Sequence, residues 1–178
     1  MKARNAILEP DPRFSTMAAG FDAAGAVRMM TVGDLHDQMA EIHLHLAVPP
    51  GIAEQFDKAR HAYVYSWFAY DLVSLAEQQG YQTLELALRE KLPVPEREKA
   101  DREHWGLGKL FGRAIAHGWL TPRPVIPGTR MTAFDFLVMS RNELAHGSRN
   151  LFPAGSVEML EQCAEILNEL FSPRGSNR

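Results

Sequence analysis

The longest periodic stretch of the chain is IAEQFDKARHAYVYSWFAYDLVSLAEQQ, residues 52–79. Large apolar and small side chains recur in it at steps of three and four residues, which is the spacing of one face of an α-helix. The spacing predicts one long central helix with two buried flanks, capped by Gly80 and followed by a second helix over residues 83–92. Because an amphipathic helix must bury its apolar face against other elements, the stretch predicts a helical bundle.

Further helical patterns follow in the second half of the chain. The charged, proline-bracketed segment 93–104 predicts a solvated connection or a short exposed helix. Apolar residues at helical spacing then predict three more helices, at about 107–120, at 132–146 closed by Gly147, and from a Ser156 cap to Phe171. We therefore expect a mainly α protein with a helical bundle over residues 51–171.

Residues 1–50 carry weaker patterns, and we expect them to form an N-terminal arm and accessory segment. Small and apolar residues around Gly25 predict a short β-hairpin within residues 21–32. Asp34 is placed to cap the start of a helix that runs to about Ala47. At the other end, we expect residues 172–178 to form a disordered tail.

Composition limits the class of protein. A chain of 178 residues with 46% hydrophobic and 23% charged residues fits one globular domain. Its formal net charge of −3 argues against a broadly basic surface that coats nucleic acid, although a local positive patch is compatible with it. The single cysteine, Cys163, excludes an intramolecular disulfide. The first residues lack the apolar core of a signal peptide, so we expect a cytoplasmic protein that does not enter a membrane.

One short run indicates chemistry rather than packing: RNELAHG, residues 141–147. On a helix, Arg141 falls on the same stripe as Phe134, Leu137 and Leu144, so it interrupts an otherwise apolar face. Burial of a guanidinium without a partner costs several kcal/mol. We therefore expect Arg141 to meet a carboxylate, a phosphate or a subunit interface.

The polar residues of this run can cooperate. Asn142 lies four residues before His146, a spacing at which the amide can orient the imidazole. Arg141 and His146 are five residues apart, so their side chains leave a regular helix in directions roughly 140° apart. Unwinding before Gly147, the reach of the arginine, or a second copy across a two-fold axis would bring them together.

A purely structural interpretation of the same residues stays open. A histidine just before a terminal glycine is favoured by the helix dipole and needs no catalytic role. The chain also offers three carboxylates as partners for Arg141: Glu85, Glu143 and Asp135.

On these residues the chain resembles the HEPN superfamily (higher eukaryotes and prokaryotes nucleotide-binding). Its members are helical bundles, and its ribonuclease subset carries an arginine and then a histidine a few residues later, often with a polar residue straight after the arginine. Arg141, Asn142 and His146 match this pattern. The aromatic helix at 63–70 and the following helix at 83–89 also resemble the preceding helices of uncharacterised bacterial HEPN-like proteins.

The resemblance covers about residues 51–171 and implies an endoribonuclease that works without a metal ion or other cofactor. His146 would take the proton from a ribose 2′-hydroxyl or protonate the leaving 5′-oxygen. Arg141 would stabilise the scissile phosphate, and Asn142 would orient His146 or bond a phosphate oxygen. The expected products carry 2′,3′-cyclic phosphate and 5′-hydroxyl ends.

The resemblance also implies partners: a homodimer, an RNA substrate, and a cognate antitoxin or regulator of a bacterial defence or toxin–antitoxin system. An alternative is a non-catalytic HEPN-like dimer that serves as a regulatory, scaffold or nucleotide-binding module. Other arginines are candidates for contacts with the RNA backbone if they converge near His146: Arg149, Arg130, Arg113 and Arg123.

A third hypothesis is a metal site at His36, His43 and His45. It would need the three imidazoles within a few ångströms of one another. On a helix, His43 and His45 point in nearly opposite directions, so we expect an amphipathic or surface helix there and no metal.

Overall fold

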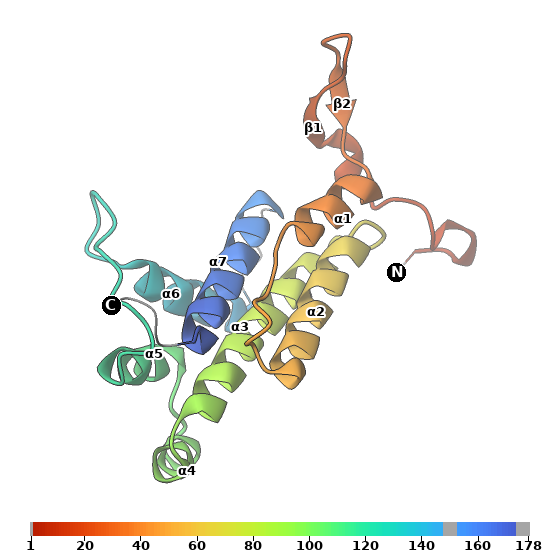
Figure 1. The fold of residues 1–178 in the computed structure, drawn as a ribbon. Helices are drawn as coiled ribbons and strands as arrows, with labels where there is room; N and C mark the ends of the chain where they lie inside the picture. Colours follow the sequence, from red (N-terminus) through yellow and green to blue (C-terminus); the bar gives the residue numbers. More distant parts are fainter. Residues whose placement is uncertain (1, 148–152, 174–178) are drawn as a thin grey trace.

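The computed structural model describes residues 2–147 and 153–173. Within them the chain forms seven α-helices, two short 3-10 helices and one two-stranded antiparallel sheet, so the predicted mainly helical fold with an N-terminal hairpin is confirmed (Figure 1). The elements are 3-10 helices Arg4–Ala6 and Phe14–Thr16, strands β1 Ala18–Phe21 and β2 Val27–Met29, and helices α1 Val32–Ala40, α2 Pro50–Tyr65, α3 Leu72–Lys91, α4 Val94–Arg102, α5 Leu107–Ala116, α6 Ala133–Ala145 and α7 Pro153–Phe171.

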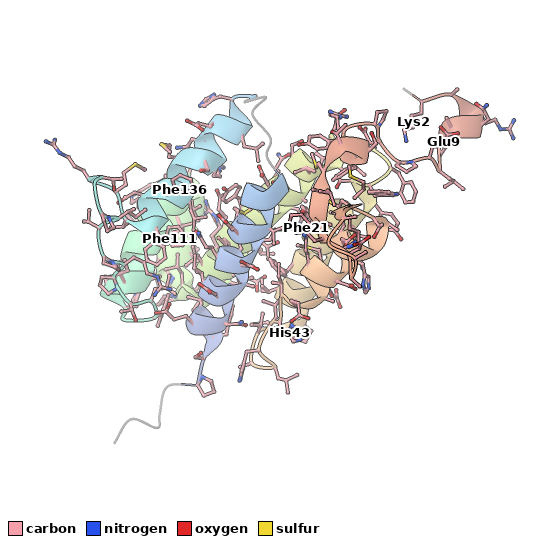
Figure 2. All side chains as sticks on the ribbon, turned by 90° about the horizontal axis from the view of Figure 1, so that it is seen from above. Lys2, Glu9, Phe21, His43, Phe111 and Phe136 are labelled. Atoms are coloured by element: carbon pink, nitrogen blue, oxygen red, sulfur yellow. The ribbon has the colours of Figure 1, made fainter. Side chains whose placement is uncertain are left out.

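Helix α3 is the centre of the bundle. It packs against α2 on one side and against α7, α5 and α6 on the others. Viewed from above, α7 lies between the α5–α6 pair and the N-terminal helices (Figure 2). The largest fully buried side chains join these helices in one core: Phe14, Leu35, Met39, Ile52, Phe56, Tyr63, Leu84, Leu88, Leu110, Leu137, Leu160 and Leu167.

The central helical stretch is broken, but not where the sequence suggests. Helix α2 ends at Tyr65 and α3 begins at Leu72, whereas the expected cap Gly80 lies buried inside α3. A Cβ atom at Gly80 would stand 3.0 Å from Leu160 Cδ2, so this glycine lets α7 approach α3 closely. The prediction of one helix over 52–79 was wrong because both halves bury a face of the same period and no glycine or proline marks the turn between them.

The N-terminal segment holds this turn in place. The Asp11 carboxylate accepts hydrogen bonds from Arg13 Nε at 2.8 Å and from the Tyr70 backbone N–H at 3.1 Å. The Asp11 N–H in turn donates to the Trp67 carbonyl at 2.7 Å. The fully buried Phe14 ring packs with its centroid 5.5 Å from that of Trp67 and 5.3 Å from that of Tyr70. Part of the segment expected as an accessory arm therefore belongs to the core.

Helix α1 differs from the sequence prediction in its N-terminal cap and in its last residue. It is capped by Thr31, whose Oγ1 accepts from the Asp34 N–H at 3.3 Å, while the Asp34 carboxylate accepts from the Thr31 N–H at 2.7 Å. Asp34 thus completes a capping box and is not itself the cap. The helix ends at Ala40, not near Ala47, because the Asn168 amide of α7 holds the backbone beyond it through His43 O and His45 N–H.

Two of the remaining helices differ at their ends from the sequence prediction. Residues 94–102 form a short helix, which was one of the two alternatives predicted for this segment. Helix α5 ends at Ala116, whereas the sequence predicted an end at Leu120. Helix α7 begins at Pro153, and Ser156 does not cap it. The buried Ser156 hydroxyl instead donates to the Glu77 carboxylate of α3. Of the expected tail, residues 174–178 lie outside the described residues.

Removal of the Phe14 ring tests whether the N-terminal segment is part of the core. We expect Phe14→Ala to lower the free energy of unfolding by about 3–5 kcal/mol, because a fully buried aromatic ring is lost and a cavity is left beside the turn. Phe21→Ala is the matched control, since Phe21 is 75% exposed in the hairpin, and should cost less than about 1 kcal/mol. Urea denaturation measures both. Equal losses would contradict the packing described here.

Acidification tests the Asp11 contacts. The hydrogen bonds from the Arg13 guanidinium hold the pKa of the Asp11 carboxyl well below its ordinary range. A carboxyl whose pKa is lowered on folding stabilises the fold above its unfolded pKa of about 3.9, and this contribution is lost as pH falls below that value. Between about pH 6 and pH 3, the wild type should therefore lose more unfolding free energy than Asp11→Asn. Parallel losses in both proteins would show that Asp11 does not carry this dependence.

Candidate functional site

Helix α6 carries the Arg141–His146 run and is fixed at both ends. At its start, Thr132 and Asp135 form a capping box, with the Asp135 carboxylate 2.8 Å from the Thr132 N–H. At its end, Gly147 takes a φ of +83°, a left-handed conformation that glycine adopts without strain. The predicted helix closed by Gly147 is confirmed. On its buried face, Phe134 stacks on Phe111 of α5 with ring centroids 4.5 Å apart.

Arg141 meets a carboxylate, as the sequence leads one to expect. Its Nε donates to Glu85 Oε1 of α3 at 2.9 Å, so of the three candidate carboxylates Glu85 is the partner. The Arg141 side chain is 38% exposed. Its Nη1 lies 3.5 Å from Asn142 Oδ1, at the outer limit of a hydrogen bond. Within residues 2–147 and 153–173, Nη2 has no hydrogen-bond partner.

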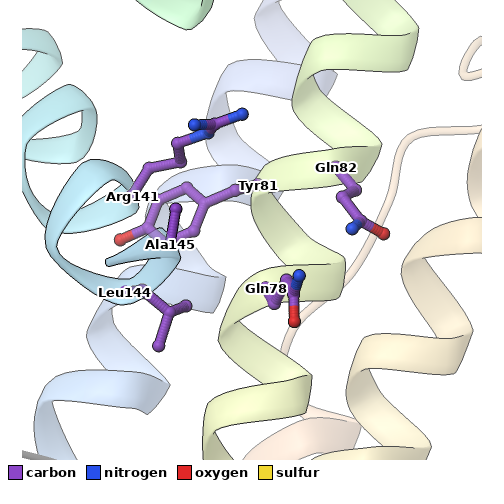
Figure 3. Close-up of a pocket in the computed structure, with 6 residues that line it drawn as sticks. All are labelled: Gln78, Tyr81, Gln82, Arg141, Leu144 and Ala145. Carbon is purple, nitrogen blue, oxygen red and sulfur yellow. The ribbon is translucent and has the colours of Figure 1, made fainter. Parts of the chain in front are cut away.

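A small pocket lies beside this pair, where α6 faces α3. It measures about 70 Å³, and its lining comes from both helices: Gln78, Tyr81, Gln82, Arg141, Leu144 and Ala145 (Figure 3). Tyr81 is buried, and burial raises the pKa of its phenol above the ordinary value. Pockets that enclose small-molecule ligands usually measure about 300–1,000 Å³. This pocket therefore does not enclose a nucleotide by itself, and any larger ligand would lie across its open side.

His146 stands at the exposed end of the same helix. Its backbone N–H donates to the Asn142 carbonyl at 3.0 Å, which ends α6. Its imidazole makes no hydrogen bond to any other residue that the structure describes, and the Asn142 side chain contacts Arg141 instead. The structure thus brings together Arg141, Asn142 and Glu85. It shows no contact from Arg141 or Asn142 to the imidazole among the described residues.

The other candidate arginines do not gather around His146 as free charges. Arg113 forms two hydrogen bonds with Glu96, at 3.0 and 2.7 Å, which lower the pKa of that carboxyl. Arg123 pairs with Glu169 of α7 at 2.6 Å. Arg130 lies exposed in the loop before α6, and Arg149 lies outside the described residues. Two of the four arginines that were assigned to RNA binding, Arg113 and Arg123, are therefore compensated by carboxylates within the chain.

Apart from Glu85, which the sequence offered as one of three partners for Arg141, sequence reasoning did not find the α3 side of the site. Gln78, Tyr81 and Gln82 line the pocket from neighbouring turns of α3, and Glu85 accepts from Arg141 one turn further on. Their spacing of three, four and seven residues is the signal of one helix face, and it could have identified them. The sequence prediction missed this spacing because it placed a helix end at Gly80, which divided the face between two helices.

The histidines near α1 do not form a metal centre. His36 Nδ1 contacts Asp37 at 3.1 Å, His43 Nδ1 contacts the Glu41 carbonyl at 2.7 Å, and His45 Nδ1 accepts from the Ala47 N–H at 3.0 Å. Among the described residues, no three histidine, cysteine, aspartate or glutamate side chains cluster in a way that could hold a metal ion. Each helix that the structure describes is too short or too polar to cross a lipid bilayer.

Comparison of the chain with protein-family models, with curated proteins and with solved structures finds no match. The interpretation of the α6 site therefore rests on its own geometry.

A double-mutant cycle tests what the Arg141–Glu85 pair contributes to stability. Both side chains are partly exposed, so their coupling should be about 0.2–1 kcal/mol. Urea denaturation of Arg141→Ala, Glu85→Ala and the double variant measures this value. A coupling above about 3 kcal/mol would be typical of a buried structural ion pair and would favour the purely structural interpretation of Arg141.

Proposed function

We propose that this chain is a HEPN-like protein that acts as a homodimer and cuts RNA without a metal ion at the C-terminal end of α6. One observation carries the proposal. Glu85 anchors the Arg141 guanidinium through a single nitrogen, Nε, beside an exposed helix end whose His146 imidazole has no partner among the described residues. An oriented arginine and an available histidine near the same helix end are the groups that cleavage of a phosphodiester by proton transfer requires.

The anchoring of Arg141 is compatible with phosphate binding. A guanidinium has five N–H donors, and Glu85 accepts from only one of them. The Nη donors could bond two non-bridging oxygens of a phosphate and stabilise the negative charge that grows during attack. Glu85 would then serve as a positioning residue that holds Arg141 toward α3. The Asn142 amide, 3.5 Å from Nη1, would move to a phosphate oxygen or stay on the arginine.

His146 would move the protons. As base, an imidazole takes the proton from the ribose 2′-hydroxyl, and the 2′-oxygen attacks phosphorus. The bond to the 5′-oxygen breaks, and that oxygen receives a proton from an imidazolium. The products are a 2′,3′-cyclic phosphate and a 5′-hydroxyl. One histidine cannot easily act on both sides of the phosphorus at once, which is a reason to involve a second copy of the chain.

The surface of α6 supports the homodimer. Phe136 and Met139 lie on α6 at a spacing of three residues and are 47% and 38% exposed (Figure 2 labels Phe136). Neighbouring exposed apolar side chains on a helix are a surface that a second copy of the chain could cover. A two-fold axis beside α6 would cover them and place two copies of Arg141 and His146 in one groove. RNA contacts would stay local, in keeping with the net charge of −3.

Cleavage of end-labelled total RNA in excess chelator tests the proposal. We expect discrete cuts that end in cyclic phosphate, and a decrease of about 10²–10⁴-fold in rate for His146→Ala and for Arg141→Ala. Matched controls are His61→Ala on α2 and Arg97→Ala on α4, which remove the same residue types far from α6 and should cut at the wild-type rate.

Two results would refute this assignment. One is cleavage that persists in both α6 variants, which would point to a contaminating nuclease or another site. The other is the absence of cleavage by any form while the wild type is a folded dimer. The second result leads to the alternative below.

A second candidate function is a non-catalytic HEPN-like dimer, as a regulatory, scaffold or nucleotide-binding module of a cytoplasmic defence or toxin–antitoxin system. The observation that favours it is the position of Asn142, which contacts Arg141 and leaves the His146 imidazole without an orienting partner in the described residues. In this case RNA or nucleotide binding would weaken in Arg141→Ala and stay unchanged in His146→Ala. Both variants would bind an antitoxin-like partner as well as the wild type does.

A further inference from the structure

The β-hairpin extends away from the bundle (Figure 1). Its apolar side chains are exposed. Phe21 pairs with Val27 across the two strands, and strand alternation places Met29 on the same face as Val27. These three side chains are 75%, 59% and 42% exposed. The described sheet has only two strands, so both are edge strands. An isolated hairpin of this kind is marginally stable, and its free edges are templates for another strand.

The opposite face of the hairpin is tied to α1. Arg28 forms two hydrogen bonds with the Asp34 carboxylate, at 2.8 and 2.6 Å, and these lower the pKa of that carboxyl. The contact fixes the hairpin relative to α1 and leaves a groove of about 520 Å³ between them. The groove is lined by Ala18, Ala19, Met30, Asp34, Asp37, Gln38 and Glu41.

The groove offers both backbone groups and negative charge. The register shift between Ala18 and Gly20 leaves Ala19 without a residue opposite it in β2. Arg28 compensates the charge of Asp34. Among the described residues, no lysine or arginine pairs with Asp37 or Glu41, although His36 lies 3.1 Å from Asp37. The side of β1 that faces α1 therefore combines an unpaired strand edge with two carboxylates that have no lysine or arginine partner among the described residues.

We propose that the β1 edge binds an extended segment of a partner protein in which apolar and basic residues alternate. Added to β1 as a third strand, such a segment presents its side chains alternately to the two faces of the sheet. Its apolar side chains extend the surface of Phe21, Val27 and Met29. Its lysine or arginine side chains reach Asp37 and Glu41 across the groove. The site is separate from the α6 end and does not depend on the proposed ribonuclease activity.

A second copy of the hairpin fits this edge less well than a basic partner strand. The sequence of both strands, AAGF and VRM, contains one basic residue, Arg28, and this residue is already bound to Asp34. Self-pairing would therefore leave the charges of Asp37 and Glu41 uncompensated. Charge complementarity therefore favours a basic segment of a different protein over a second copy of this chain.

Fluorescence anisotropy with a labelled synthetic peptide tests the proposal. The probe alternates lysine and valine. One control peptide replaces lysine by glutamate, and a second keeps the sequence but carries N-methyl groups on alternate backbone nitrogens. We expect the first peptide to bind the full chain, and its affinity to fall at least about tenfold on N-methylation or replacement of lysine by glutamate. Amide signals of Ala18–Phe21 should shift in NMR spectra as the peptide is added.

The protein variants separate strand addition from simple charge attraction. Asp37→Lys with Glu41→Lys should weaken binding at least about tenfold. Glu54→Lys with Glu98→Lys makes the same change in net charge on α2 and α4 and should weaken it less than about threefold, because these sites lie outside the groove. Equal binding of the N-methylated peptide, equal loss in both double variants, or no binding would overturn the proposal. So would a wild-type dimer that dissociates in Phe21→Ser, since the edge would then be a self-interface.

Discussion

The fold depends on the contact between the Asp11 carboxylate and the backbone at Tyr70, with the Phe14 ring packed beneath it. This contact stabilises the turn at residues 66–71, where a continuous helix would otherwise be favoured by the periodicity on both sides. The turn lets α2 fold back along α3, and α3 then carries α5, α6 and α7 on its other faces. Helix α3, which carries Glu85, thus begins at a turn that is held by an N-terminal segment remote from it in the sequence.

The sequence is informative where local physical chemistry decides the structure. The capping pair Thr132 and Asp135 and the left-handed Gly147 define α6, and its bounds were predicted within about one residue. Prediction failed where tertiary contacts decide. Helix α1 stops at Ala40 because the side chain of Asn168, far along the chain, holds the next backbone groups. No local pattern reports such a contact.

The candidate site shows the same division. The spacing identified Arg141 as an arginine in need of a partner, but it left three carboxylates open, and only the packing of α6 on α3 selects Glu85. The pair has two consequences of opposite sign for the proposed chemistry. It cancels part of the charge of Arg141 for long-range attraction of RNA, and it removes the entropy cost of orienting a long side chain. The second effect favours the ribonuclease proposal, since five donors leave room for phosphate.

The central claim is that Arg141 and His146 contact the same phosphodiester. NMR titration of the protein with a 2′-O-methyl RNA, which binds but cannot be cut, measures this directly through the Arg141 Nε–H signal and the His146 ring signals. If the account is right, both sets of signals change with the same midpoint, and the His146 response is lost in Arg141→Ala but kept in Arg97→Ala. RNA binding that leaves the signals of Arg141 and His146 unchanged would contradict it.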